Sequence, residues 1–153
     1  MNKISETAFE DRSPSYSPDG GKILFSSSRI ENYDIYLMNA DGTGRQKLTP
    51  DAISGSEDFS PSWSPDGSQI AFDSNREGTG DVWVMDADGS NPHNVSNLRH
   101  GAWFPYWSPD GSMMAFERRI GDVTNVWVMN ANGSGKTQLT SDSVFAGRPS
   151  WQP

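Results

Sequence analysis

The chain has 153 residues, no cysteine and a formal net charge of −8. This length suits one domain, and the lack of cysteine excludes disulfides, thiolate metal ligands and cysteine nucleophiles. An acidic chain lacks the positive surface that attracts nucleic acid or an anionic membrane, so we expect neither partner. No apolar stretch approaches the ~20 residues of a membrane span. Residues 1–13 lack the apolar segment of a signal peptide, so none is expected there.

A repeat organises the sequence. The tetrapeptide Ser-Pro-Asp-Gly begins at Ser17, Ser64 and Ser108, at intervals of 47 and 44 residues. A second phrase follows each copy, in the forms DIYLMNADG, DVWVMDADG and NVWVMNANG, and each unit closes on KLT, NVS or QLT. A period of ~40–45 residues is typical of propeller blades.

The second unit illustrates the elements expected in chain order. Residues 61–64 (PSWS) predict a short strand, and the Pro-Asp-Gly that follows predicts a tight turn, because Pro presets φ and Gly accepts a positive φ. Residues 69–75 (QIAFDSN) and 81–87 (DVWVMDA) predict two further strands. The closing stretch, residues 94–96, predicts a short fourth strand. Each unit is therefore expected to be a four-stranded antiparallel sheet.

The strand faces indicate how these sheets pack. In DVWVM, Val82 and Val84 point one way while Trp83 and Met85 point the other, so both faces are apolar. A propeller blade packed between two neighbours needs two apolar faces. We therefore predict an all-β fold, a β-propeller with three four-stranded antiparallel blades. The blades cover approximately residues 10–50, 57–96 and 101–140, with overhangs 1–9 and 141–153.

The pattern P-x-W-S-P-D-G…I-A-F…S-x-R…D-I-Y-x-M-x-A-D-G…L-T resembles the TolB-type (WD-like) propeller repeat. A similar repeat occurs in the propeller domains of the prolyl oligopeptidase and tricorn groups. The resemblance covers nearly the whole chain and implies a six-bladed propeller without a catalytic motif. It also implies a protein partner, a lipoprotein in the TolB family, and a bacterial periplasmic location. The repeat is shared by proteins of different function, so the fold alone does not assign one.

The two ends of the chain repeat each other. The first eighteen residues align without a gap to the last eighteen, with Ile4 opposite Leu139 and Tyr16 opposite Trp151. Three blades do not close a ring, since propellers have about four to eight. Two chains give six blades, and twofold dimers are the commonest closed assemblies. We therefore predict a homodimer that forms one six-bladed ring.

Other assemblies are open alternatives: a fragment of a longer propeller, a closed trimer or an open filament. In the dimer, the tail of one chain and the head of the other compete for the same strand positions. Part of one terminus is therefore expected to be displaced or exchanged.

Two arginines precede aspartates by five residues, and the third unit has neither partner. The matching positions are Arg29 with Asp34, Arg76 with Asp81, and Ile120 with Asn125. Because both partners disappear together, we predict a structural Arg–Asp pair across one loop. A ligand contact is the alternative.

The inner strands supply candidate binding residues around the channel. Asp11, Arg12, Asp58 and Phe59 precede the prolines of these strands, and Arg148 holds the same place in the C-terminal overhang. Asp11 and Asp58, doubled in a dimer, are weak candidates for a cation site of four carboxylates. Solvated carboxylates balanced by Arg12 are the alternative. No other metal ligand set and no cofactor motif is present.

The connection NLRHGAWFPYW differs from its equivalents. It offers Arg99, His100, Trp103 and Phe104 where the other units have small or acidic residues. Aromatic residues with arginine are the composition of binding hot spots. Packing between blades or between two chains is the alternative.

The sequence therefore predicts a non-catalytic propeller scaffold, not an enzyme, that binds a protein, a peptide or a small ligand at the channel mouth. No nucleophile with a partnering base is evident. Three alternatives remain. The chain is a peptide-filtering module of a peptidase, an excised or engineered half-propeller with no ligand, or a hydrolase or lyase that uses channel carboxylates.

Overall fold

The structure is a computed structural model that describes residues 9–49, 55–98, 101–141, 147 and 149–151. In this part of the chain, twelve strands and no helix are formed, so no helix could cross a membrane. The strands are β1 (Asp11–Tyr16), β2 (Lys22–Ile30), β3 (Asn32–Asn39), β4 (Gln46–Lys47), β5 (Asp58–Trp63), β6 (Gln69–Ser74), β7 (Asp81–Asp86), β8 (His93–Asn94), β9 (Ala102–Trp107), β10 (Met113–Ile120), β11 (Val123–Asn130) and β12 (Thr137–Gln138).

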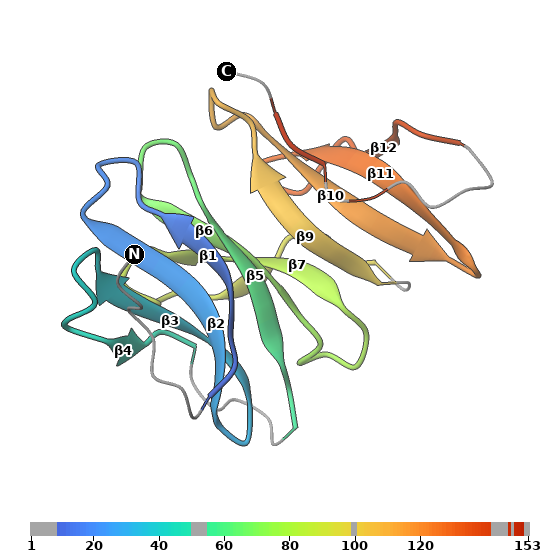
Figure 1. Ribbon diagram of the computed structural model, residues 1–153. Helices are drawn as coiled ribbons and strands as arrows, with labels where there is room; N and C mark the ends of the chain where they lie inside the picture. Colours follow the sequence, from blue (N-terminus) through green and yellow to red (C-terminus); the bar gives the residue numbers. More distant parts are fainter. Residues whose placement is uncertain (1–8, 50–54, 99–100, 142–146, 148, 152–153) are drawn as a thin grey trace.

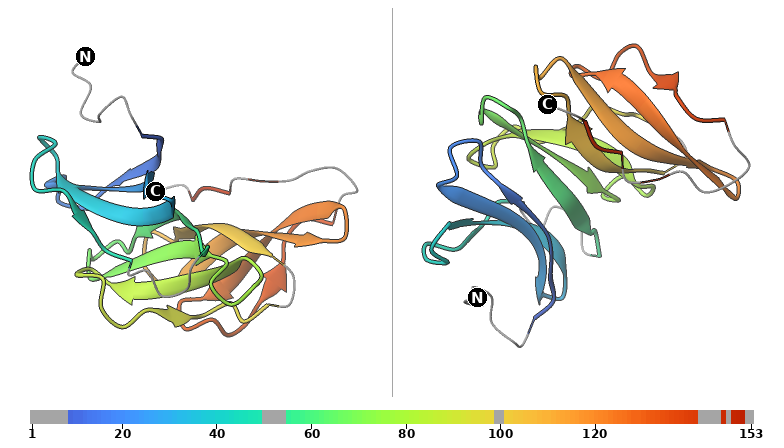
Figure 2. Two further views of the ribbon diagram at one scale, coloured as in Figure 1. Left: turned by 90° about the horizontal axis from the view of Figure 1, so that it is seen from below. Right: turned by 45° about the horizontal axis from the view of Figure 1, so that its top comes forward.

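The strands form three four-stranded antiparallel sheets in the order β1-β2-β3-β4, β5-β6-β7-β8 and β9-β10-β11-β12. The predicted all-β fold with three such blades is confirmed. The first strands of the sheets lie side by side, with β5 between β1 and β9 (Figure 1). The sheets follow one another in an arc, with the first and third at its two ends (Figure 2).

The Ser-Pro-Asp-Gly turns join the first two strands of each sheet. In the second sheet, the Ser64 hydroxyl donates to Asp66 Oδ1 at 2.6 Å and accepts the N–H of Gln69 at 2.9 Å. Gly67 has φ of 72°, a conformation that glycine adopts without strain. The bonds from Ser64 and from the N–H of Ser68 lower the pKa of Asp66 to about 2. The tetrapeptide thus specifies the hairpin locally.

Each innermost strand carries an irregularity at its proline. Pairing with the second strand shifts register there, because proline has no N–H to donate to the neighbouring strand. The residue before the proline has a positive φ in all three sheets: 51° at Ser13, 52° at Ser60 and 56° at Phe104. These bulges set the direction of the side chains that face the middle of the arc.

The core lies between the sheets. Between the first and second sheets, one face of β2, β3 and residue 48 packs against the opposite face of β6 and β7; this cluster contains Leu24, Ile35, Leu37, Leu48, Ile70, Phe72, Trp83 and Met85. The second and third sheets meet in the same way through Ala71, Val82, Val84, Val95, Met114, Phe116 and Met129. The prediction that Val82 and Trp83 point to opposite faces is confirmed. Val82 packs against the third sheet and Trp83 against the first.

Phe72→Ala should lower the free energy of unfolding by about 3–5 kcal/mol, because Phe72 is fully buried between two sheets and its removal leaves a cavity. Chemical denaturation would measure the loss. The matched control is Phe9→Ala, at a ring that is 40% exposed, for which a change of at most about 1 kcal/mol is expected. Equal losses in the two variants would contradict this packing.

Candidate functional site

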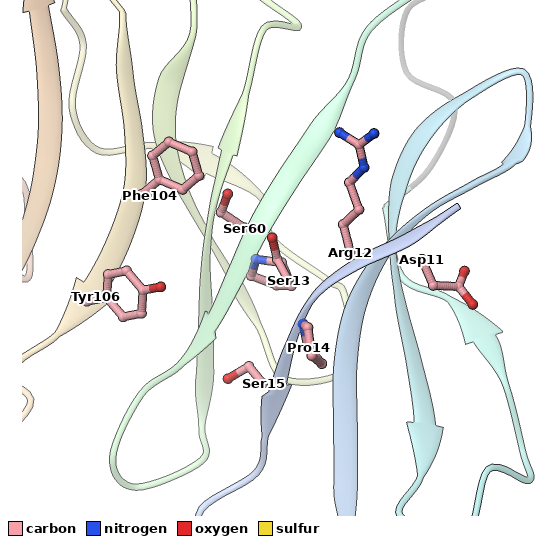
Figure 3. Close-up of a pocket in the computed structure, with 9 residues that line it drawn as sticks. Asp11, Arg12, Ser13, Pro14, Ser15, Ser60, Phe104 and Tyr106 are labelled. Atoms are coloured by element: carbon pink, nitrogen blue, oxygen red, sulfur yellow. The ribbon is translucent and has the colours of Figure 1, made fainter. Parts of the chain in front are cut away.

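A groove runs between the innermost strands, on the side of the arc where a propeller has its channel. Its volume is about 560 Å³, and its lining comes from all three sheets: Asp11, Arg12, Ser13, Pro14, Ser15, Ser60, Pro61, Phe104 and Tyr106. We call this the inner-strand groove. Figure 3 shows Phe104 and Tyr106 on one wall, with the serines and Arg12 opposite. One wall is therefore aromatic and the other is polar.

Phe104 sits in a backbone conformation that bulky residues rarely adopt, with φ of 56°. Its N–H donates to Asp73 Oδ1 of the second sheet at 3.2 Å. Asp73 is 3% exposed, and burial raises its pKa to about 6 against the opposing effect of the bonds from Phe104 and Ser60. At the previous junction, the N–H of Ser60 donates to the hydroxyl of Ser26 in the same way. The bulge thus ties the innermost strands of the second and third sheets to the sheet that precedes each of them.

Arg12 lines the groove opposite the two aromatic rings (Figure 3). Its guanidinium donates to Glu10 at 2.6 Å and lies 5.2 Å from the centre of the Tyr33 ring. The Tyr33 hydroxyl also donates to Glu10, and this bond with the one from Arg12 lowers the pKa of the Glu10 carboxyl. Arg12 is exposed and keeps donors available to a ligand in the groove.

The prediction that Asp11 and Asp58 are solvated carboxylates balanced by Arg12 is wrong. Asp58 is 2% exposed and accepts two bonds from Arg76, at 3.0 and 2.9 Å. Asp11 accepts two bonds from Arg29, at 3.1 and 2.8 Å, and Figure 3 shows its carboxylate turned away from the two aromatic rings. Both carboxylates are engaged by arginines, so neither is free to ligate a cation in the channel.

The predicted pair between Arg76 and Asp81 is also wrong. Asp81 accepts the Ser96 hydroxyl at 2.5 Å and the N–H of Leu98 at 2.8 Å, and so holds the outer edge of its sheet. Arg76 folds back over Ser74, to which its Nε donates at 3.0 Å, and reaches Asp58 on the other side. Asp34 in the first sheet pairs with Lys47 at 2.7 Å.

The sequence does carry a signal for the true partner. Where Arg29 and Arg76 are replaced by Ile120, the aspartates of the innermost strands are replaced by Ala102. In the third unit, the change from aspartate to Ala102 therefore accompanies the loss of arginine as closely as the change from aspartate to Asn125 does. Sequence separation favoured the partner five residues away, whereas antiparallel pairing brings β5 and the end of β6 together.

Phe59 and Trp103 pack between sheets. The Phe59 ring lies 4.6 Å from that of Tyr33, and a methyl group added to Gly80 would lie 2.4 Å from Trp103 Nε1. For Trp103 this is the packing between blades that the sequence left open. Arg99, His100 and Arg148 lie outside the described residues. Tyr106, which the sequence analysis missed, is 42% exposed in the groove.

The described part of the chain offers no cluster of three or more His, Cys, Asp or Glu side chains that could hold a metal ion. The described lining of the groove includes three serines but no histidine. His93 is exposed on β8, an outer strand. The arrangement can therefore hold a ligand by aromatic contact, hydroxyl hydrogen bonds and one guanidinium.

Three four-stranded antiparallel sheets, packed face to face with their first strands side by side, define a β-propeller protein. The sequence profile of the TolB beta propeller domain matches residues 1–153. The chain belongs to this family.

Known proteins share this fold over different lengths. The Tol-Pal system protein TolB of Anaeromyxobacter dehalogenans is 50% identical over 36 residues, which are 24% of this chain and 8% of the relative. A solved structure of a candidate TolB from Agrobacterium tumefaciens is 26% identical, with a TM-score of 0.79. The match covers 88% of the present chain, which spans about half of the length of that relative. A puromycin-hydrolyzing peptidase of Mycobacterium tuberculosis is 14% identical, with a TM-score of 0.68. The match covers 88% of the present chain and 21% of the peptidase, and it shows a shared fold alone.

The stability of the protein should fall as pH rises from about 4 to 6, through Asp73. Its folded-state pKa of about 6 lies above that of the unfolded chain, so the folded state binds the proton more tightly. The expected loss is roughly 2–3 kcal/mol. Asp73→Asn should abolish it, while Asp122→Asn, at an exposed carboxylate, should not. Denaturation at pH 4, 5, 6 and 7 would decide, and an unchanged slope in Asp73→Asn would refute the assignment.

Arg76→Ile should lower the free energy of unfolding by about 3–5 kcal/mol, because it leaves the buried carboxylate of Asp58 without its cation. The double variant Asp58→Ala/Arg76→Ile introduces the pair that the third sheet has at Ala102 and Ile120. Its stability should return to within about 1–2 kcal/mol of the wild type. Denaturation of the two variants tests the ion pair, and a double variant as unstable as the single one would speak against it.

Proposed function

We propose that this protein is a non-catalytic propeller scaffold that binds an extended peptide or protein segment along the inner-strand groove. In this proposal, the chain is half of a six-bladed ring, and a second copy supplies the other three blades. The groove then becomes one side of the channel. The family resemblance and the Tol-Pal relative support a bacterial periplasmic setting, which we include in the proposal.

The composition of the groove supports a peptide ligand. Phe104 and Tyr106 offer two aromatic rings on one wall, and Arg12 offers a guanidinium at the other. Aromatic residues and arginine are enriched where proteins bind proteins. A volume of about 560 Å³ lies in the usual range for ligand sites, roughly 300–1,000 Å³.

The backbone of Phe104 is the observation on which the proposal chiefly rests. The equivalent bulge positions of the first and second sheets carry serine, Ser13 and Ser60, which are small and polar. A phenylalanine at φ of 56° strains the backbone, and its ring is only partly buried in return. Strain of this kind is found at binding sites, where the position of a side chain matters more than the stability of the fold.

The chemistry of the groove supports binding over catalysis. Ser13, Ser15 and Ser60 supply hydroxyls, but a serine nucleophile needs a base within hydrogen-bond reach. Among the described lining residues, the carboxylate of Asp11 is engaged by Arg29. The hydroxyls are therefore suited to donate and accept hydrogen bonds along a peptide backbone.

Phe104→Ser should weaken peptide binding by about tenfold or more without loss of stability. The change removes an aromatic contact, and it introduces the residue that the other two sheets have at this positive φ, so the fold should tolerate it. A random-peptide phage library would be selected on the immobilised wild type, and the enriched peptide titrated by calorimetry. Tyr106→Ala should weaken binding similarly.

His93→Ala serves as the control, since it removes an exposed ring on β8, away from the groove. Its affinity for the enriched peptide should match that of the wild type. Failure to enrich any peptide, or equal affinities for wild type and Phe104→Ser, would rule out the groove as the binding site.

A further inference from the structure

A smaller pocket, separate from the groove, lies at the junction of the second and third sheets. Its volume is about 260 Å³, and its lining includes Glu57, Phe59, Asp73, Gly80 and Trp103. None of these residues lines the inner-strand groove. The volume is several times the roughly 30 Å³ that one water molecule takes up in the liquid, so the space suits a larger chemical group. We call it the Asp73 pocket.

The equivalent place at the first junction holds an aromatic ring and no charge. At the position of Gly80, the first sheet has Tyr33, whose ring lies 4.6 Å from that of Phe59. At the position of Asp73, the first sheet has Ser26. The second junction thus has glycine in place of a ring and a carboxylate in place of a hydroxyl. Space and negative charge are therefore introduced together.

Asp73 is a buried carboxylate without a cation. It is 3% exposed, and within the described part of the chain it forms no ion pair with a lysine or arginine. The N–H of Phe104 donates to its Oδ1 at 3.2 Å, and Ser60 also bonds to it. Burial raises the pKa of Asp73 to about 6, so most of the carboxylate is still ionised at neutral pH. A buried charge without a counter-ion is costly, and a cation in the pocket would remove that cost.

Two other buried aspartates show what Asp73 lacks. Asp58 is 2% exposed and pairs with Arg76 at 2.9 Å, and Asp34 is 5% exposed and pairs with Lys47 at 2.7 Å. The Nη2 of Arg76 donates to both carboxylate oxygens of Asp58, so this cation is already engaged. Asp73 therefore has neither an arginine nor a lysine of its own.

Two aromatic rings complete the walls. Phe59 and Trp103 are partly buried, and a methyl group added to Gly80 or to Gly101 would overlap the Trp103 ring. The two glycines thus let the indole pack directly against the backbone, which fixes its position. Aromatic faces attract ammonium groups through the ring quadrupole, and tryptophan does so most strongly. Glu57 adds a second carboxylate to the lining.

We infer that the Asp73 pocket binds an alkylammonium group, with Asp73 and Glu57 as its anions and the Trp103 and Phe59 rings as its walls. An ammonium suits this site better than a guanidinium does. The planar guanidinium matches two free oxygens of one carboxylate, whereas Phe104 and Ser60 already use part of Asp73. An ammonium donates singly and in any direction.

The ammonium can belong to a free amine or to the lysine side chain of another protein, since both present the same aliphatic stem. The pocket shares none of its lining residues with the inner-strand groove. The inference therefore goes beyond the proposed function and does not require a peptide in the groove.

n-Butylammonium is the first probe, because it reproduces the lysine side chain without its backbone. It is titrated into ¹⁵N-labelled protein at neutral pH and physiological salt, and the indole N–H resonance of Trp103 is followed by NMR. Trp103→Phe assigns that resonance. A saturable shift with a roughly millimolar dissociation constant is expected. 1-Butanol, a neutral molecule with the same stem, should bind at least about tenfold more weakly.

Asp73→Asn should weaken the binding of n-butylammonium by about tenfold or more, because it removes the charge and keeps an oxygen for the N–H of Phe104. Asp73→Ser introduces the residue of the first sheet and should act similarly, so it replaces the first variant if that one does not fold. Asp122→Asn is the matched control. It removes one negative charge from a fully exposed side chain outside the pocket and should leave the dissociation constant unchanged.

Three results would overturn the inference: no saturable shift of the Trp103 resonance, equal binding of n-butylammonium and 1-butanol, or equal affinities of Asp73→Asn and Asp122→Asn. The last would mean that the acidic chain attracts cations generally. N-acetyl-lysine methylamide then separates the two sources of the ammonium. Binding of both probes supports a lysine side chain, and binding of n-butylammonium alone supports a free amine.

Discussion

The need of each sheet to bury two apolar faces governs this structure. A strand such as β7 places Val82 and Val84 on one side and Trp83 and Met85 on the other, and all four are buried. One sheet cannot bury both faces by itself, and the contacts between neighbouring sheets cover four of the six faces. On the outer face of the first sheet, Ile23, Phe25, Tyr36 and Met38 are also buried, whereas Leu139 on the outer face of the third sheet is 59% exposed. The packing of neighbouring sheets therefore holds the arc together.

Much of the fold was predictable because its signals are local and repeated. The Ser-Pro-Asp-Gly turn satisfies its own hydrogen bonds within six residues, from Ser64 to Gln69, so its sequence is sufficient evidence for the hairpin. The alternation in β7 depends only on strand geometry. Three copies of each signal remove the ambiguity that a single copy would leave.

The candidate site was less predictable because it depends on contacts across strands and between sheets. The partner of Arg76 was assigned by proximity in sequence, but strand pairing selected Asp58. The positive φ of Phe104 arises from a bulge at a proline, and its N–H depends on Asp73 of another sheet. Phe104 was predicted as a binding residue from the aromatic and arginine content of its connection, whereas Tyr106 on the same wall of the groove was not predicted. Side-chain direction at a bulge is not encoded in a two-residue period.

The groove and the open ends are related by the same geometry. The innermost strands form the groove only because the sheets are held in an arc, and the arc closes a channel only if further sheets complete it. Light scattering on a size-exclusion column over a range of concentrations tests this directly. A stable species of twice the chain mass of 16.8 kDa is expected. A monomer at all concentrations, or a series of growing aggregates, would contradict a ring made of two half-propellers.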